Sequence, residues 1–304
     1  MKIKREFKIL TILAIPLLLG SCAFNFTYFR PSKLPKSNFH FIQNDKVLVK
    51  TDTIFVQMDT TSLQPTFQNR NKEIIDFGYS IESVIFESSS RNKLNGWMIK
   101  PVGIKIIGTI LHFHGSGGNL LYHHKIISPL TKFGFQIFTF DYSGFGYSEG
   151  KPTRKSVTED AFSAYNYISE REDIRNKKMI LYGQSYGVHL ATVLGVKYQN
   201  KIAGMVLEAG FSSHRDIATH TIPVLGNIVK QGICAKNGIK KFNKPLLIIH
   251  SKEDQRVPFN MSEKIYLHAN EPKEFYEVDK PHIEALLYYS KEISSKIKNM
   301  CKLE

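Results

Sequence analysis

The stretch Tyr182-Gly183-Gln184-Ser185-Tyr186-Gly187 decides the fold of this chain. It reads Gly-x-Ser-x-Gly and lies between a short apolar run, residues 179–181, and a run compatible with a helix, residues 188–196. A strand that turns sharply into a helix holds the serine in a strained bend, where the flanking glycines are needed because a Cβ would clash with the crossing backbone. The bend exposes the hydroxyl and directs the next backbone N–H to the same point. The stretch therefore predicts an α/β protein in which Ser185 is a nucleophile.

A nucleophilic serine needs a base and an acid that orients the base, and the sequence offers both downstream. Residues 245–250 are apolar on both faces, as in a buried parallel strand, and Asp254 follows this run. The carboxyl ends of such strands form the edge at which open α/β sheets hold their sites. Another short strand is predicted at residues 274–278, and His282 follows it on a loop before a long helical run. We expect Asp254 to be the acid and His282 to be the base.

A glycine-rich loop earlier in the chain is suited to stabilising a negative charge. Residues 106–113 read as a central strand and lead into His114-Gly115-Ser116-Gly117-Gly118-Asn119. Glycines in such a turn expose backbone N–H groups with no side chain in the way. We expect the N–H groups of Ser116 and Tyr186 to form the oxyanion hole, where the loss of one donor costs a factor of about 10²–10³ in rate.

Three segments together resemble the α/β-hydrolase superfamily over roughly residues 80 to 300, and most closely its small membrane-associated serine hydrolases. They are the loop His114–Asn119, the segment Asp141–Gly150 and the stretch around Ser185. The nucleophile, the acid and the histidine also follow one another in the order of that superfamily. One departure is Ser143, which stands where the family usually has an arginine, so a structural contact of that arginine is in doubt.

The resemblance implies a mostly parallel central sheet of about eight strands flanked by helices, with a small cap inserted at about residues 211–243. It also implies cleavage of esters, thioesters or amides without a cofactor. The cap segment is either an apolar lid that shapes the acyl pocket or an ordinary packed helical excursion, and the sequence favours neither. Two other carboxylates compete for the acid role, Glu208 at the end of an earlier strand and Glu253 beside the favoured residue. Asp254 is preferred because the acid–Val–Pro segment has the usual family position.

The beginning of the chain resembles a bacterial lipoprotein signal. Four basic residues precede an apolar run of about eleven residues, which is too short to span a bilayer comfortably, and Leu19-Gly20-Ser21-Cys22 follows. The resemblance implies removal of residues 1–21, lipid attachment at Cys22 through fatty acyl groups such as palmitate, and a place in the bacterial cell envelope. Ala23 rather than aspartate after the cysteine favours the outer membrane. The alternative is an uncleaved anchor in which the cysteine stands by chance.

The remaining sequence predicts one large domain. Residues 22–72 are rich in Pro, Ser, Asn, Thr and Lys and are predicted to be the lipidated N-terminus and a tether, followed by the hydrolase domain at 73–304. Within that domain, residues 83–86 and 94–99 are expected to form an antiparallel pair. The chain of 304 residues has 42% hydrophobic residues, enough for a core.

The charge and the histidines bear on nucleic-acid and metal binding, and the cysteines bear on disulfide formation. The formal net charge is +14, but the lysines are scattered and no nucleic-acid motif is present, so no nucleic-acid partner is predicted. His112 and His114 lack a third ligand nearby, so no metal is predicted. Cys234 and Cys301 are either paired or free, which the sequence leaves open.

The sequence thus predicts a membrane-anchored serine hydrolase that cleaves a carboxylic ester or thioester of a small or lipid-like acyl substrate through Ser185, His282 and Asp254. A peptidase or amidase with the same triad is one alternative. A catalytically inactive lipid-anchored binding protein is the other. The physiological substrate, the acyl chain length and the oligomeric state are not indicated by the sequence.

Overall fold

The computed structural model describes residues 28–35, 39–45, 50–226, 229, 231–232 and 234–304. The predicted lipoprotein signal and Cys22 lie outside these residues. In the described part of the chain, no helix combines the length and apolar character needed to cross a bilayer.

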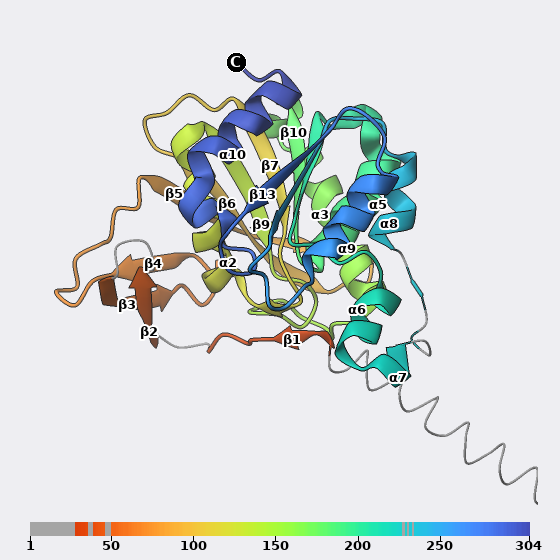
Figure 1. Ribbon diagram of the computed structural model, residues 1–304. Coiled ribbons are helices and arrows are strands. Elements are labelled where there is room, and N and C mark those ends of the chain that lie inside the picture. Colours follow the sequence, from red (N-terminus) through yellow and green to blue (C-terminus); the bar gives the residue numbers. More distant parts are fainter. Residues whose placement is uncertain (1–27, 36–38, 46–49, 227–228, 230, 233) are drawn as a thin grey trace, which may run out of the picture.

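An eight-stranded sheet forms the centre of the molecule (Figure 1). Its strands are β5 (Tyr79–Glu87), β6 (Lys93–Pro101), β7 (Gly108–Phe113), β9 (Phe135–Phe140), β10 (Met179–Gln184), β11 (Gly204–Glu208), β12 (Leu246–Ser251) and β13 (Lys273–Val278). Their spatial order is β13-β12-β11-β10-β7-β9-β6-β5. Only β6 runs against its neighbours, and every other pairing is parallel. The sheet has the strand number and mostly parallel character that the sequence predicts, and β5 and β6 are the predicted antiparallel pair.

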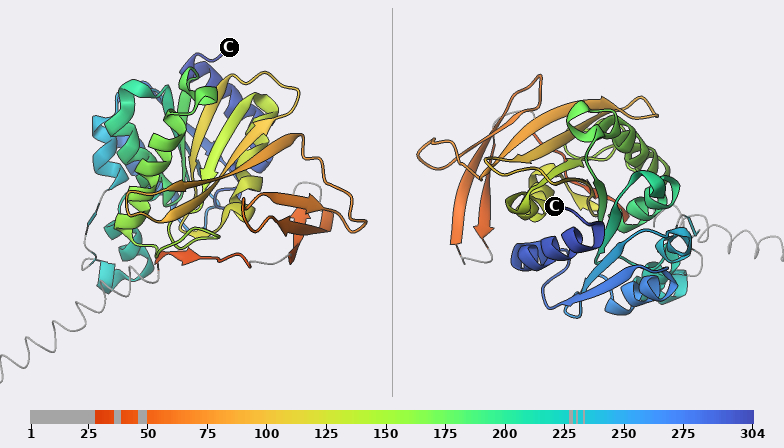
Figure 2. Two further views of the ribbon diagram at one scale, coloured as in Figure 1. Left: turned by 180° about the vertical axis from the view of Figure 1, so that it is seen from behind. Right: turned by 90° about the horizontal axis from the view of Figure 1, so that it is seen from above.

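Helices cover both faces of this sheet (Figure 2). They are α2 (Leu120–Ile127), η1 (Ser128–Phe133), α3 (Arg154–Ser169), α4 (Glu172–Arg175), α5 (Gly187–Tyr198), η2 (Gln199–Lys201), α6 (His214–Thr221), α7 (Pro223–Gly226), α8 (Ala235–Gly238), η3 (Ile239–Lys241), α9 (Phe259–His268) and α10 (Ala285–Cys301), where η marks a 3-10 helix. Helices α3, α5 and α9 pack on one face and α2 and α10 on the other.

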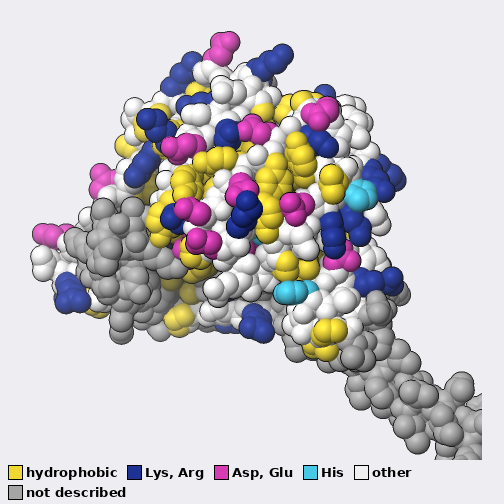
Figure 3. Space-filling model, in the orientation of Figure 1, with side chains coloured by type: hydrophobic (Ala, Val, Ile, Leu, Met, Phe, Trp, Pro, Cys, Tyr) yellow, Lys and Arg dark blue, Asp and Glu magenta, His cyan; other side chains and the backbone are white. Residues whose placement is uncertain are grey.

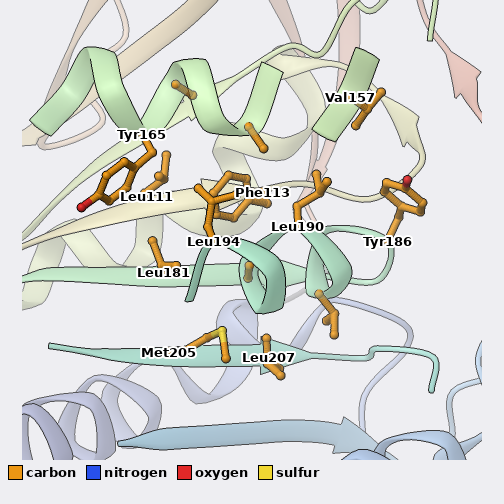
Figure 4. Close-up of a cluster of buried hydrophobic side chains, with 14 of the residues drawn as sticks. Leu111, Phe113, Val157, Tyr165, Leu181, Tyr186, Leu190, Leu194, Met205 and Leu207 are labelled. Atoms are coloured by element: carbon orange, nitrogen blue, oxygen red, sulfur yellow. The ribbon is translucent and has the colours of Figure 1, made fainter. Parts of the chain in front are cut away.

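The two cores follow from the alternation of side chains along each strand. In β10, Leu181 belongs to the core under α3 and α5, whereas Ile180 and Tyr182 belong to the core under α2 and α10. Because both faces are covered, the central strands are largely apolar on both sides. Figure 4 shows the first core, with Tyr186 at its margin where α5 begins.

The N-terminal part of the chain differs from the prediction. Residues 22–72 were expected to be a lipidated end and a tether, but the described part holds a three-stranded sheet of β2 (Phe39–Asp45), β3 (Lys50–Met58) and β4 (Pro65–Gln68). Ile54, Val56 and Phe67 of this sheet are buried in the core that also holds α2 and α10. The tether prediction was wrong here because strands with one solvent-facing side alternate polar and apolar residues, which gives them a hydrophilic composition.

The expected cap segment, 211–243, contains α6, α7, α8 and η3. Several of its side chains, including Ile217, Ile239 and Phe242, are buried against the core under α3 and α5. The described part of this segment thus packs as a helical excursion of the fold.

Candidate active site

Ser185 lies in a sharp turn between β10 and α5, with a backbone φ of +52°. Few residues other than glycine adopt this left-handed conformation, which marks a strained position. A Cβ added to Gly187 would lie 1.9 Å from the carbonyl oxygen of Phe113, and one added to Gly183 would lie 2.5 Å from the carbonyl oxygen of Gly187. Both glycines are therefore required by the crossing backbone, as the sequence predicts.

The carboxylate of Asp254 holds the ring of His282, with 2.6 Å between Oδ2 and Nδ1. A carboxylate only accepts hydrogen bonds, so Nδ1 carries the proton and Nε2 is left as an acceptor. Asp254 follows β12 and His282 follows β13, so both residues reach the carboxyl edge of the sheet. Both also line a cavity of about 1090 Å³ that Ser185 lines. The structure thus brings all three predicted residues to one cavity.

Asp254 is fixed on both of its oxygens. Its Oδ1 accepts the N–H groups of Arg256 at 2.8 Å and Val257 at 3.0 Å. Burial raises the pKa of Asp254, but hydrogen bonds from the His250 and His282 rings outweigh burial and hold it well below its usual range. The acid therefore stays ionised at neutral pH, as the orienting partner of a catalytic histidine must.

His250 is a member of this site that sequence reasoning did not identify. Its Nε2 lies 3.2 Å from Oδ2 of Asp254 and 3.0 Å from the carbonyl oxygen of Val257, so it donates to two oxygens. Its Nδ1 lies 2.6 Å from Oγ of Ser262. The ring thereby fastens the acid to the end of β12. The available signal was a histidine next to the end of an otherwise apolar strand.

Neither competing carboxylate contacts the His282 ring through a hydrogen bond in the described part of the structure. Glu208 instead accepts the Tyr182 hydroxyl at 2.8 Å, the Gln184 side-chain amide at 2.7 Å and the N–H of Ala285 at 3.1 Å. It thus ties the beginning of α10, just after the histidine loop, to the serine strand. Burial raises the pKa of Glu208.

The predicted oxyanion loop lies against the serine. A Cβ added to Gly115 would lie 3.5 Å from the Cβ of Ser185, and Ser116 lines the same cavity. Tyr186 is the residue from which α5 begins, so its N–H belongs to the helix end whose N–H groups lack intrahelical partners. The positions of Ser116 and Tyr186 beside the serine suit their predicted role as donors.

Charged side chains form much of the cavity wall. Arg30, Lys252 and Arg256 contribute positive charge, while Glu253 and Glu284 contribute negative charge. Lys252 is also paired with Glu277, with 2.6 Å between Nζ and Oε1. The described residues of segment 211–243 contribute no side chain to this wall. The cavity therefore presents charged groups of both signs near Ser185.

Comparison with known proteins identifies the family of this fold. Residues 108–230 match the family described as the alpha/beta hydrolase fold. The YfhR protein of Escherichia coli strain K12 is 35% identical over 213 residues, which cover 68% of this chain and 75% of YfhR. The chain belongs to the α/β-hydrolase fold family.

Solved structures show the same fold. The esterase Pf2001 of Pyrococcus furiosus matches with a TM-score of 0.60 and 20% identity, over 74% of this chain and 91% of the esterase. An acetyl xylan esterase from Paenibacillus sp. R4 matches with a TM-score of 0.59 and 18% identity, over 74% and 85%. At these identities the likeness concerns the fold alone.

This α/β hydrolase fastens the Ser143 loop without the arginine usual in the family. The Ser143 N–H donates to Oδ2 of Asp160 at 2.7 Å, and its hydroxyl lies 3.0 Å from Oδ1. The Asn92 side chain also donates to this hydroxyl, at 3.1 Å. Burial raises the pKa of Asp160 to about 6. The loop is thus held by hydrogen bonds to a buried carboxyl group.

The histidines and cysteines without a predicted catalytic role in this α/β hydrolase are held by contacts inside the fold. His112 lies 2.9 Å from Oγ1 of Thr139 and 2.9 Å from Oε1 of Gln184, and His114 stacks on Tyr142. Across the described residues, no three His, Cys, Asp or Glu side chains are grouped to hold a metal ion. The two remaining cysteines are both buried, and neither forms a disulfide. They are Cys234 and Cys301.

Proposed function

We propose that this protein is a serine hydrolase that cleaves a carboxylic ester or thioester through an acyl-enzyme intermediate. The observation that carries the proposal is the 2.6 Å contact between His282 Nδ1 and Asp254 Oδ2, in a cavity that the strained Ser185 also lines. The esterase activity named for two proteins of the same fold favours esters over amides.

The mechanism follows from the tautomer of the histidine. Because Nδ1 donates to Asp254, Nε2 accepts the proton of the Ser185 hydroxyl as its oxygen attacks the carbonyl carbon. The N–H groups of Ser116 and Tyr186 stabilise the oxyanion that forms. His282 then gives its proton to the leaving alcohol or thiol. In the second half of the reaction, Nε2 of His282 takes a proton from water as the water oxygen attacks the acyl carbon. His282 then returns the proton to the Ser185 oxygen, and the carboxylic acid is released.

The test is the pair of variants Ser185→Ala and Ser90→Ala. We expect Ser185→Ala to lose stoichiometric labelling by a fluorophosphonate and at least about 10³-fold of the kcat for p-nitrophenyl butyrate. Ser90 is exposed in the turn between β5 and β6, and its variant should keep both. Labelling and turnover that survive Ser185→Ala would refute the assignment. A wild-type protein that is neither labelled nor active would favour the binding-protein alternative.

A substrate panel separates the reaction classes. Matched butyryl esters, butyryl thioesters and aminoacyl anilides should be hydrolysed with kcat/KM falling in that order. Anilide turnover that exceeds ester turnover would identify a peptidase or amidase.

We further propose that Cys22 carries lipid, which holds the hydrolase at the bacterial envelope. Arg30, which lines the catalytic cavity, is only eight residues further along the chain. Eight residues span at most about 29 Å, so the cavity would stay near the bilayer surface. Cys22→Ser should move the protein from the membrane fraction to the soluble fraction and abolish palmitate labelling. Cys234→Ser should do neither, and an unchanged Cys22→Ser variant would contradict the proposal.

A further inference from the structure

Residues 28–35, here called the N-terminal strap, run along the oxyanion loop. Within the strap, β1 (Arg30–Pro31) pairs in parallel with β8 (Gly117–Gly118). The Arg30 N–H donates to the carbonyl oxygen of Ser116 at 2.8 Å, and the Ser32 N–H donates to that of Gly118 at 3.1 Å. The strap thus holds the backbone of the loop on both sides of Gly117.

The other side of the strap is fixed to the loop that follows β9. The Gly146 N–H donates to the carbonyl oxygen of Ser32 at 3.1 Å. The ammonium group of Lys33 donates to the carbonyl oxygen of Ser148 at 2.7 Å. The strap therefore lies between the oxyanion loop and the loop after β9, and joins them through its backbone and the Lys33 side chain.

Two rings of the strap reach the second predicted oxyanion donor: Tyr28 lies with its centroid 5.4 Å from that of Tyr186, and Phe29 lies closer. The Phe29 side chain is 5% exposed, and its ring packs edge-on against Tyr186 with centroids 4.8 Å apart. It also packs edge-on against Phe145 at 6.3 Å. The strap consequently contacts both residues whose N–H groups are assigned to the oxyanion, Ser116 through its backbone and Tyr186 through two rings, of which Phe29 lies closer.

We propose that the strap is a positioning element of the active site, which holds Ser116 and Tyr186 where their N–H groups meet the developing oxyanion. The inference rests on the proposed hydrolase function. The oxyanion loop contains three glycines between His114 and Asn119, so its own backbone is weakly restrained. Misplacement of a catalytic group by about 1 Å can cost about 10²-fold in rate. An external restraint on this loop is therefore a catalytic requirement.

The test uses Phe29→Ala with Phe67→Ala as its matched control. Phe67 is 6% exposed and packs edge-on against Trp97, in the core beneath the small sheet. Both variants lose a buried ring of the same size, but only Phe29 contacts Tyr186. Fluorophosphonate labelling counts the competent sites in each preparation, so that kcat is expressed per labelled site.

We expect Phe29→Ala to lower kcat for p-nitrophenyl butyrate about 10–100-fold, while KM changes less than about threefold. The affinity for butylboronic acid, whose serine adduct mimics the tetrahedral oxyanion, should fall in parallel. Phe29→Leu should restore most of both, and Phe67→Ala should keep both despite a lower melting temperature.

Unchanged kcat per site in Phe29→Ala would overturn the inference, and so would an equal loss in Phe67→Ala. If Phe29→Ala does not fold, Phe29→Leu decides the question, because a smaller loss of kcat and boronate affinity at constant KM is still expected. If the wild-type protein is inactive, or if its activity survives Ser185→Ala, the proposed function itself is refuted.

Discussion

The carboxyl edge of the sheet that carries the proposed triad, here called the catalytic edge, meets the N-terminal strap at the oxyanion loop. The two regions act on the site through different kinds of contact. The edge presents Ser185, Asp254 and His282, whose side chains contact one another or share one cavity. The strap acts on the same site chiefly through backbone hydrogen bonds to Ser116 and Gly118. Chemistry at the edge therefore depends on residue type, whereas restraint by the strap depends on the path of the chain.

The difference explains why one region can be found in the sequence and the other cannot. A nucleophile, an acid and a histidine restrict each position to one or two residue types. A backbone N–H that donates to a neighbouring strand is supplied by every residue except proline. Sensitivity to conservative substitution should thus be high at the edge and low along the strap, where even Phe29→Leu should retain most of the activity.

Among the substitutions that test the difference between the catalytic edge and the strap, Asp254→Asn should cause the largest loss of kcat. Asp254→Asn keeps the shape of the side chain but removes the charge that selects the tautomer of His282, and about 10³–10⁴-fold of kcat should be lost. Glu208→Gln makes the same chemical change in a buried carboxylate that holds the serine strand and α10. It should lose about 10-fold or less, as measured by p-nitrophenyl butyrate turnover per labelled site. A larger loss in Glu208→Gln would transfer the acid role to Glu208.

The sequence predicts the features that depend on residue type better than those that depend on the path of the chain. The strands of the large sheet could be located, and the three residues proposed for catalysis selected, because apolar runs and glycine turns have periodic or type-specific signatures. The supports of the acid could not, since the contact of His250 with Asp254 depends on how a loop folds back on β12. The small sheet was missed because β3 opens with four polar residues and holds only the short apolar run Ile54-Phe55-Val56, which gives no clear alternation.

The composition gives the net charge but does not show how the charged side chains are distributed over the surface. Figure 3 shows acidic side chains interspersed among the basic ones on the face that it displays. On this face the charge forms no continuous basic surface, which is the feature that nucleic-acid binding requires. On the face shown, the net charge of +14 is thus not concentrated in one basic patch.

A smaller effect, on stability, tests the backbone requirement of the catalytic edge itself. In Gly187→Ala the new Cβ would lie 1.9 Å from the carbonyl oxygen of Phe113, and backbone cannot yield as a side-chain end does. We expect a loss of about 3 kcal/mol or more in unfolding free energy, or an insoluble protein. Gly232→Ala is the control, because its Cβ would meet only the end of the Arg154 side chain, at 3.5 Å. Circular dichroism melting would measure both, and equal melting temperatures would contradict the steric account.

The smallest effect concerns Asp141, which lies where the strap meets the edge. Its buried Oδ1 accepts the N–H of Leu120 at 2.9 Å, while within the described structure Oδ2 has no hydrogen-bond partner. Burial raises the pKa of Asp141 to about 8, although the Leu120 N–H and the charge of Lys33 on the strap oppose the rise. The unfolded chain has a pKa of about 3.9 for this residue, so between about pH 4 and pH 8 the folded state binds the additional proton. Stability contributed by this group is therefore present at low pH and is lost as the pH rises through that window.

Asp141→Asn removes the titration while it keeps an oxygen that can accept the Leu120 N–H. Relative to wild type, the variant should gain on the order of 1–3 kcal/mol in unfolding free energy between pH 5 and pH 8, as measured by urea denaturation at both values. If the difference between the two proteins were the same at both pH values, the carboxyl group would already be ionised in the fold. In the expected case, the neutral carboxyl group of Asp141 lies against Gly146, whose N–H donates to Ser32 of the strap, and a rise in pH would place a buried charge beside this contact.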